Sequence, residues 1–301
     1  MIDFVKIVFD KSYKEEMRSL LLSNEFLDFI KTLHLTTGVI DDSTRGKFNN
    51  LDILIYPQRE IQIKNSLHSL YNSIKTSENI NYNDFTLSNI KEVLKSLENA
   101  FGKEYLQHTY LTQLEFGFNI ELPIKATDFV WEYILTYKNN QHNYSMSDRK
   151  GYIKKFIYED YEIKIYDKGK ESKLATQNLL RIEVKYKGRD VLNKLGVNTL
   201  MDVEEEVVLR SLYEDFRKKI DDLLIVGTFM EKDKTKISEK DWCKIVQYTN
   251  PFYFVTAGLA SSAKTLRKRK LKSLIKKYKL DSAHKQLTDL IEKKFTQLLN
   301  N

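Results

Sequence analysis

A tyrosine and a lysine at the end of a predicted strand are the first residues in this sequence that could carry out a reaction. Residues 161–171, YEIKIYDKGKE, alternate apolar and polar residues up to Tyr166, and Gly169 ends the pattern. A phenol has a pKa of about 10, so a nucleophilic tyrosine needs a nearby cation or a metal near neutral pH. Lys168 could supply that charge and offset the charge of a transferring phosphate. The spacing also fits a half-buried strand tyrosine followed by a solvated turn.

Two glutamates lie in the middle of otherwise apolar strand patterns. Glu115 lies within LEFGFNI and Glu183 within LRIEVKY. A carboxylate in the buried part of a sheet is unfavourable unless it is paired or coordinates a cation. Together the two could hold Mg²⁺ or Mn²⁺ through hard oxygen ligands. The alternative for each is an outward-facing polar stripe.

His68, in the segment Ser66-Leu67-His68 after a predicted strand, is a third candidate ligand for a metal or a phosphate oxygen. A lone histidine can equally be structural. The motifs of P-loop ATPases, dinucleotide-binding enzymes, zinc proteases and α/β-hydrolases are absent, and the five histidines are scattered. The single cysteine, Cys243, allows no internal disulfide or multi-cysteine zinc site.

The positive charge is concentrated near the end of the chain. The 301 residues carry a formal net charge of +7, of which residues 201–301 contribute +6, with 21 Lys and Arg against 15 Asp and Glu. Such a block favours phosphate binding through counterion release, although a solvated helix face would look the same. The proposed DNA contacts are Lys264, Arg267, Lys268, Arg269, Lys270, Lys272, Lys276 and Lys277.

The composition is that of a folded protein, and hydrophobic periodicity predicts the elements that position these residues. The sequence is 42% hydrophobic, and no apolar run approaches the length of a membrane helix. The start, MIDFVKIVFDK, lacks the features of a signal peptide, so a cytoplasmic location is expected. Expected strands are residues 1–10, 51–56, 60–64, 110–122, 152–158, 161–167 and 180–186. Expected helices are residues 12–33, 84–100, 127–135, 202–225, 238–248, 251–279 and 282–299.

This order predicts an α+β fold in two domains. Residues 1–200 would form a domain based on an antiparallel sheet, and residues 201–301 an all-helical, basic domain.

The order of several short motifs resembles a known family. The motifs are the initial MID strand, EIQIKNSLHSLYN at 60–72, NYNDFT at 81–86, LEFGFNI at 114–120, IKIYDKGKE at 163–171 and NLLRIEVKY at 178–186, and KLGV at 194–197 follows. This order is similar to the phage and plasmid replication initiation proteins of the filamentous-phage gene II/X family, which are rolling-circle Rep proteins. The YDKGxE and R-[IF]-E motifs are also similar to initiators of staphylococcal plasmids. The match spans roughly residues 1–200.

The resemblance implies a site-specific DNA strand transferase that nicks an origin, stays on the 5′ phosphate and later rejoins the ends, with a divalent metal. By resemblance, Tyr166 would be the nucleophile, Lys168 its neighbour, and Glu115, Glu183 and His68 the metal ligands. The implied partners are the double-strand origin, the displaced single strand, and host helicase and polymerase, with no membrane. A homodimer is compatible with the family. The H-x-H metal strand of the wider nicking class is absent.

Three alternatives stay open at this stage. Other tyrosines near the motif could be the nucleophile. The chain could instead be a non-catalytic, sequence-specific DNA-binding protein, such as a replication or copy-number regulator, or a protein-interaction module. The alternative tyrosines are Tyr152, Tyr158, Tyr161 and Tyr186.

Overall fold

The computed structural model describes the chain except for residues 25–26, 28, 57–59, 139, 144–151 and 228–235. Its centre is a sheet of nine strands, and every neighbouring pair is antiparallel. In sheet order the strands are β2 (Phe29–His34), β3 (Val39–Phe48), β4 (Leu51–Ile55), β5 (Ile61–Ser66), β1 (Ile2–Phe9), β6 (Thr109–Glu121), β10 (Leu179–Lys187), β9 (Tyr161–Asp167) and β8 (Ile153–Ile157).

Helices pack against this sheet, and a second sheet of two strands, β7 (Ile134–Tyr137) and β11 (Leu223–Ile225), lies beside it. The α-helices are α1 (Lys14–Leu22), α2 (Leu67–Thr76), α3 (Leu87–Phe101), α4 (Lys103–Leu106), α5 (Ala126–Asp128), α6 (Lys168–Glu171), α7 (Arg189–Asn193), α8 (Glu206–Asp221), α10 (Glu239–Thr249), α11 (Pro251–Thr256), α12 (Ser261–Lys277) and α13 (Ser282–Asn300). Shorter turns are η1 (Lys11–Tyr13), the π-helical η2 (Phe129–Tyr133) and η4 (Met201–Glu204).

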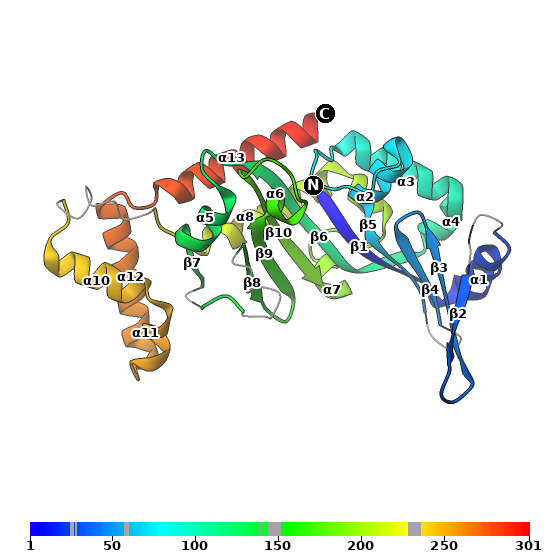
Figure 1. The fold of residues 1–301 in the computed structure, drawn as a ribbon, viewed down its shortest axis with the longest axis horizontal. Coiled ribbons are helices and arrows are strands. Elements are labelled where there is room, and N and C mark those ends of the chain that lie inside the picture. Colours follow the sequence, from blue (N-terminus) through cyan, green and yellow to red (C-terminus); the bar gives the residue numbers. More distant parts are fainter. Residues whose placement is uncertain (25–26, 28, 57–59, 139, 144–151, 228–235) are drawn as a thin grey trace.

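One face of the central strands is covered by helices. The other face, which we call the open face, is partly covered by residues 81–83, where Asn81 contacts Asp3 and Arg181. Phe116 and Phe118 of β6 pack against Phe216 of α8, and Phe118 also meets Phe295 of α13. Residues of β6 alternate between the two faces, so Glu115 and its odd-numbered neighbours point away from these helices. The arrangement is visible in Figure 1, where α8 and α13 lie behind β6 and β10. The fold is therefore α+β, as the sequence predicts.

The last third of the chain contributes to two hydrophobic cores. Buried residues of α8 and α13, such as Phe216 and Phe295, belong to the large core under the sheet. A second, smaller core joins Val226, Ile245 and Leu274, from the segment that includes α10 and α12. These helices extend to one side of the sheet in Figure 1. The division of the chain at residue 200 stays a prediction.

Several boundaries differ from the periodicity-based expectations. The helix expected over 12–33 ends at Leu22, and Phe29–His34 is strand β2, because it pairs with β3. Short apolar runs do not distinguish helix from strand, and here the long-range pairing decides. The helix expected over 251–279 is two helices, with Gly258 between them at a φ of +56°. Strand β3 and helix α2 were not expected, and β11 is a short strand within the helical last third.

Candidate metal and nucleophile site

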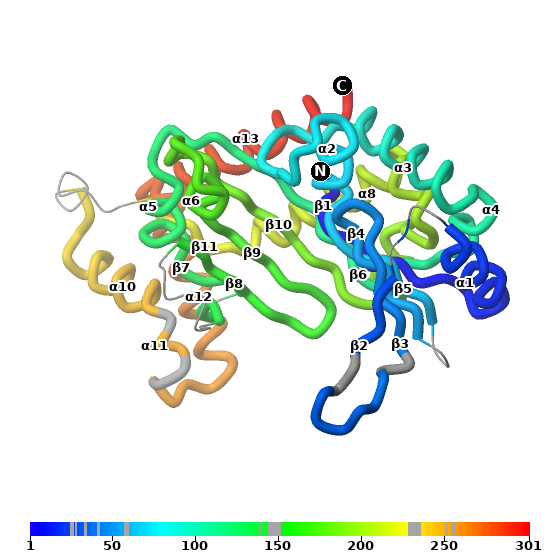
Figure 2. Tube along the Cα trace, turned by 45° about the vertical axis from the view of Figure 1, so that its right-hand side comes forward, coloured from blue at the N-terminus to red at the C-terminus, as the bar shows by residue number. Residues whose placement is uncertain are grey.

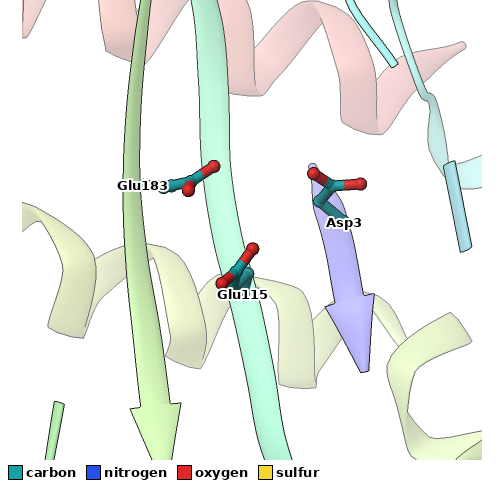
Figure 3. Close-up of side chains that lie close together, drawn as sticks. All are labelled: Asp3, Glu115 and Glu183. Carbon is teal, nitrogen blue, oxygen red and sulfur yellow. The ribbon is translucent and has the colours of Figure 1, made fainter. Parts of the chain in front are cut away.

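Three carboxylates from three neighbouring strands converge on the open face of the sheet. Asp3 of β1, Glu115 of β6 and Glu183 of β10 each offer an oxygen, and these oxygens all lie within 4.8 Å of one another. The three residues are only 8%, 7% and 3% exposed. Figure 3 shows them projecting on the side away from the helices behind the sheet. The structure thus brings the two predicted glutamates together and adds Asp3, which the sequence pattern did not single out.

Strand register explains this convergence. Glu183 lies directly opposite Gly117, which is two residues beyond Glu115 on the same face of β6. A Cβ atom at Gly117 would lie 2.3 Å from the Ile182 carbonyl oxygen and 2.6 Å from the Glu183 Cβ, so only glycine fits there. On the other side of β6, Ile2 of β1 lies opposite Phe116 and Val5 lies opposite Leu114. The three-residue step in β1 therefore matches a two-residue step in β6, which is a β-bulge. Asp3 lies in this bulge, an irregularity that commonly redirects side chains at functional sites.

Three basic side chains hold the acidic cluster together, and one of them is Lys185, whose Nζ lies 3.6 Å from Glu115 Oε1. Arg181 lies 2.5 Å from Asp3, Nη2 to Oδ2, and Lys164 donates hydrogen bonds from Nζ to Glu115 (2.9 Å) and to Glu183 (3.2 Å). These ion pairs compensate carboxylates that would otherwise be buried without a partner. The alternation along β10 and β9 places Arg181 and Lys164 on the same face as Glu183, so the sequence pattern could have indicated both of these basic residues.

One oxygen of the cluster lacks a hydrogen-bond partner. Glu183 Oε2 lies 2.8 Å from Arg181 Nε, yet the angles are not those of a hydrogen bond, and both buried atoms are left without one. The close approach is an electrostatic contact that lacks the directionality of a hydrogen bond. A buried carboxylate oxygen without a hydrogen bond, beside two further carboxylates, is a donor set that suits a hard divalent cation. The residues therefore fit a divalent cation.

The acids of the cluster respond differently to burial. Burial opposes ionisation of Asp3, but the Arg181 guanidinium and the hydrogen bond from Ser66 outweigh it and hold the pKa of Asp3 below its usual value. Burial raises the pKa of Glu115, and repulsion from Glu183 adds to the effect despite the nearby Lys164. Glu115 is consequently the carboxyl group of this pair that holds a proton more readily than usual, and a bound cation would favour its ionised form.

Tyr166 lies beside this cluster. It is directly opposite Arg181 in the β9–β10 register, and it lines an open cavity of about 250 Å³ together with Lys164, Glu171 and Glu183. Burial, followed by the charge of Glu183, raises the pKa of Tyr166 well above its usual value, and Arg181 opposes the shift. In this state the phenol is protonated at neutral pH.

Lys168, the expected neighbour of the phenol, is buried and forms an ion pair with Glu171. Its Nζ lies 2.6 Å from Glu171 Oε2 and 5.9 Å from the centre of the Tyr166 ring. The ammonium therefore stands over the face of the ring and is neutralised by Glu171, whereas Arg181 is the cation that lies opposite Tyr166 in register.

The other candidate tyrosines separate into two groups. Tyr152 lines the same cavity as Tyr166. Tyr186 and Tyr161 pair in register on the helix-covered face, where Tyr186 donates a hydrogen bond to Asp215 of α8 (2.8 Å). Tyr158 stacks on Tyr161 with ring centres 5.1 Å apart. The geometry therefore leaves Tyr166 and Tyr152 as the tyrosines on the side of the acidic cluster.

His68 lies outside the carboxylate cluster. The ring contacts Asn83 Oδ1 through Nε2 at 2.6 Å and stacks on Phe85 with centres 4.8 Å apart. Burial lowers the pKa of His68 to about 3, so the ring is neutral. Among the described residues, the group of ligand atoms that could share an ion includes Asp3, Glu115 and Glu183 but not His68.

The expected basic segment forms helix α12, which packs on α10 away from the acidic cluster. Arg269, Lys270, Lys272 and Lys276 are exposed, whereas Leu271 and Leu274 face the small core. Lys277 also projects outward but pairs with Asp241 at 2.8 Å. Residues 264, 267 and 268 are half-buried.

Comparisons with known proteins give a likeness to solved structures. No protein-family model and no curated protein sequence matches this chain. Among solved structures, a rolling circle replication initiator protein from Geobacillus stearothermophilus is similar over 78% of this chain and 90% of that chain, with 14% identity and a TM-score of 0.42. Within the described residues, no helix has both the length and the apolar character needed to span a membrane.

Proposed function

We propose that the chain is a rolling-circle replication initiator that nicks and rejoins one DNA strand at an origin through a tyrosyl-phosphate intermediate. The observation that carries this proposal is the convergence of Asp3, Glu115 and Glu183 beside Tyr166, which shares a cavity with Glu183. A cation site next to a nucleophile is the arrangement that phosphoryl transfer requires.

In the proposed reaction, the Tyr166 phenol gives up its proton to water in the open cavity, and the resulting phenolate attacks the scissile phosphorus. The bond from the phenolic oxygen to phosphorus forms and the bond to the 3′ oxygen breaks, so the 5′ phosphate stays on the protein and the released 3′ oxygen takes up a proton. Attack of that hydroxyl on the same phosphorus reverses the step and rejoins the strand. Arg181, opposite Tyr166 in register, favours the phenolate and offsets charge on the phosphate.

A divalent cation held by Asp3, Glu115 and Glu183 would supply Lewis-acid polarisation of the phosphate. The protein side chains do the rest. Lys164 keeps the two glutamates together, and the raised pKa of Tyr166 keeps the phenol protonated until DNA and the cation are in place. The exposed Lys and Arg side chains of α12 would bind phosphates of the origin duplex away from the site of strand cleavage.

One observation favours a second candidate, a non-catalytic DNA-binding regulator. Arg181 and Lys164 already neutralise the acidic cluster without a metal, as they would in a purely structural network. Such a protein would need only its basic surfaces.

The test is a covalent adduct. We expect the wild-type chain, incubated with its cognate single-stranded origin oligonucleotide and Mn²⁺, to gain a 5′-phosphoryl nucleotide on Tyr166, detected by mass spectrometry. Tyr166→Phe should form no adduct yet still bind DNA, while Tyr152→Phe, from the same cavity, should keep the adduct. An adduct in Tyr166→Phe would refute the assignment, and binding without any adduct in the wild type would favour the regulator.

A further inference from the structure

The open face of the sheet carries a row of basic side chains away from the acidic cluster. In the strand register, Lys47 of β3 lies opposite Asp52 of β4, Asp52 opposite Lys64 of β5, and Lys64 opposite Lys6 of β1. Residues directly opposite each other in antiparallel strands project from the same face. Three lysines and one acid therefore form a line across four strands.

This row and the carboxylates share one face. Lys6 lies opposite Gln113 of β6, which is two residues from Glu115 and so projects on the same side. Four strand spacings of about 4.8 Å separate β6 from β3, which places the far end of the row roughly 19 Å from the acidic cluster.

A cavity of about 540 Å³ adjoins the far end of the row. Its lining includes Arg45, Lys47 and Lys64 together with the apolar side chains of Ile30 and Leu54. Ile30, Arg45 and Leu54 lie opposite one another in register, and Ile30 is 66% exposed. This volume lies within the range of about 300–1,000 Å³ that holds small ligands in proteins. Figure 2 shows the β2–β3 hairpin, which contributes to this cavity, extending beyond the other strands.

The positive charges of this region are offset only in part, by Asp52. We call the three lysines of this line, together with Arg45 of β3, the cationic row; its members are Lys6, Lys64, Lys47 and Arg45. In the part of the chain that the structure describes, none of the four makes an ion pair with a carboxylate, although Asp52 lies between two of them. Uncompensated positive charge along a surface concentrates polyanions by releasing their counterions.

We propose that the cationic row binds single-stranded DNA and guides it across β3, β4, β5 and β1 to the acidic cluster; the second half of this inference rests on the proposed function. The phosphates would contact the row, and unpaired bases would lie on Ile30 and Leu54 in the adjoining cavity. These apolar groups on either side of Arg45 select a single strand, because the bases of a duplex are stacked inside and cannot reach them.

The test measures binding without chemistry. Fluorescence anisotropy of a labelled mixed-sequence oligonucleotide, single-stranded or as a duplex, is recorded in EDTA over a range of NaCl concentrations. For the single strand, the combined variant Arg45→Ala, Lys47→Ala, Lys64→Ala should lower the slope of log affinity against log salt by up to ~2, at ~0.7 for each phosphate that the protein no longer neutralises. Duplex binding should change little.

A matched control removes the same charge from the helix-covered side. Lys91→Ala, Lys218→Ala, Lys293→Ala changes three exposed lysines of α3, α8 and α13, and it should leave the slope for the single strand unchanged. An unchanged slope in the first variant, an equal decrease in the control or an equal decrease for the duplex would each overturn the proposal. Because no nicking is required, a protein that forms no adduct would still support or refute the row.

Discussion

Replacing Gly117 by alanine tests whether the spacing of β6 and β10 creates the site. The new Cβ would lie 2.3 Å from the Ile182 carbonyl oxygen, where ordinary contacts begin at 3.4 Å. The obstacle is backbone and cannot rotate away, so the two strands must separate by about 1 Å. Overpacking of this kind typically destabilises a protein by about 1–3 kcal/mol.

The same displacement acts on the carboxylates. Gly117 lies directly opposite Glu183 and two residues from Glu115, so the separation of the strands changes the distance between their oxygens. A misplacement of ~1 Å at a catalytic site can lower a rate by about 10²-fold. We therefore expect Gly117→Ala to lower both the free energy of unfolding and the rate of adduct formation with Mn²⁺.

Urea unfolding and a time course of adduct formation measure the two effects separately. Gly227→Ala is the control, because its Cβ would meet only Ser282 Oγ, at 3.9 Å, and neither quantity should fall. If Gly117→Ala retained wild-type stability, the close approach of β6 and β10 at this position would be wrong. If it lost stability but kept its rate, the carboxylate spacing would not control the reaction.

Two further predictions concern pH and salt. Burial lowers the pKa of Lys154 to about 8 from 10.5, so between these pH values the unfolded chain binds more protons. The difference in the free energy of unfolding between the wild type and Lys154→Met should therefore rise with pH in this range, by at most about 1.4 kcal/mol per pH unit, and stay constant below pH 8. A difference that stays constant at every pH would contradict this prediction. For duplex DNA, the double variant Lys272→Ala, Lys276→Ala should lower the slope of log affinity against log salt by ~0.9 for each phosphate left without its lysine. The control Lys91→Ala, Lys218→Ala should keep the wild-type slope. If the α12 variant also kept the wild-type slope, α12 would not be a duplex-binding element.

Part of this site could be predicted from the sequence because strands impose a period of two. The alternation around Glu115 and Glu183 indicated strands with a carboxylate at the centre, and the structure confirms both strands. The end of β9 at Tyr166 and Asp167 was also predictable, since Gly169 interrupts the same pattern. These features depend on residues near one another in the chain.

The composition of the site was decided by the tertiary structure. A period of two determines which residues share a face of a strand, but it does not determine which strands become neighbours. Asp3 joins the acids because β1 pairs with β6 across more than a hundred residues, and Lys164 reaches them because β9 pairs with β10. Likewise, His68 is held by Asn83 and Phe85, apart from the carboxylates.

Local sequence therefore determined the element types and the chemical groups that each strand face presents. Strand order, register and the bulge in β1 decided which of those groups meet, because they follow from burying apolar surface across the whole chain. The same physical reason explains why Phe29–His34 is a strand rather than the end of a helix. Its partner, β3, satisfies its backbone hydrogen bonds, and no local pattern could reveal that partner.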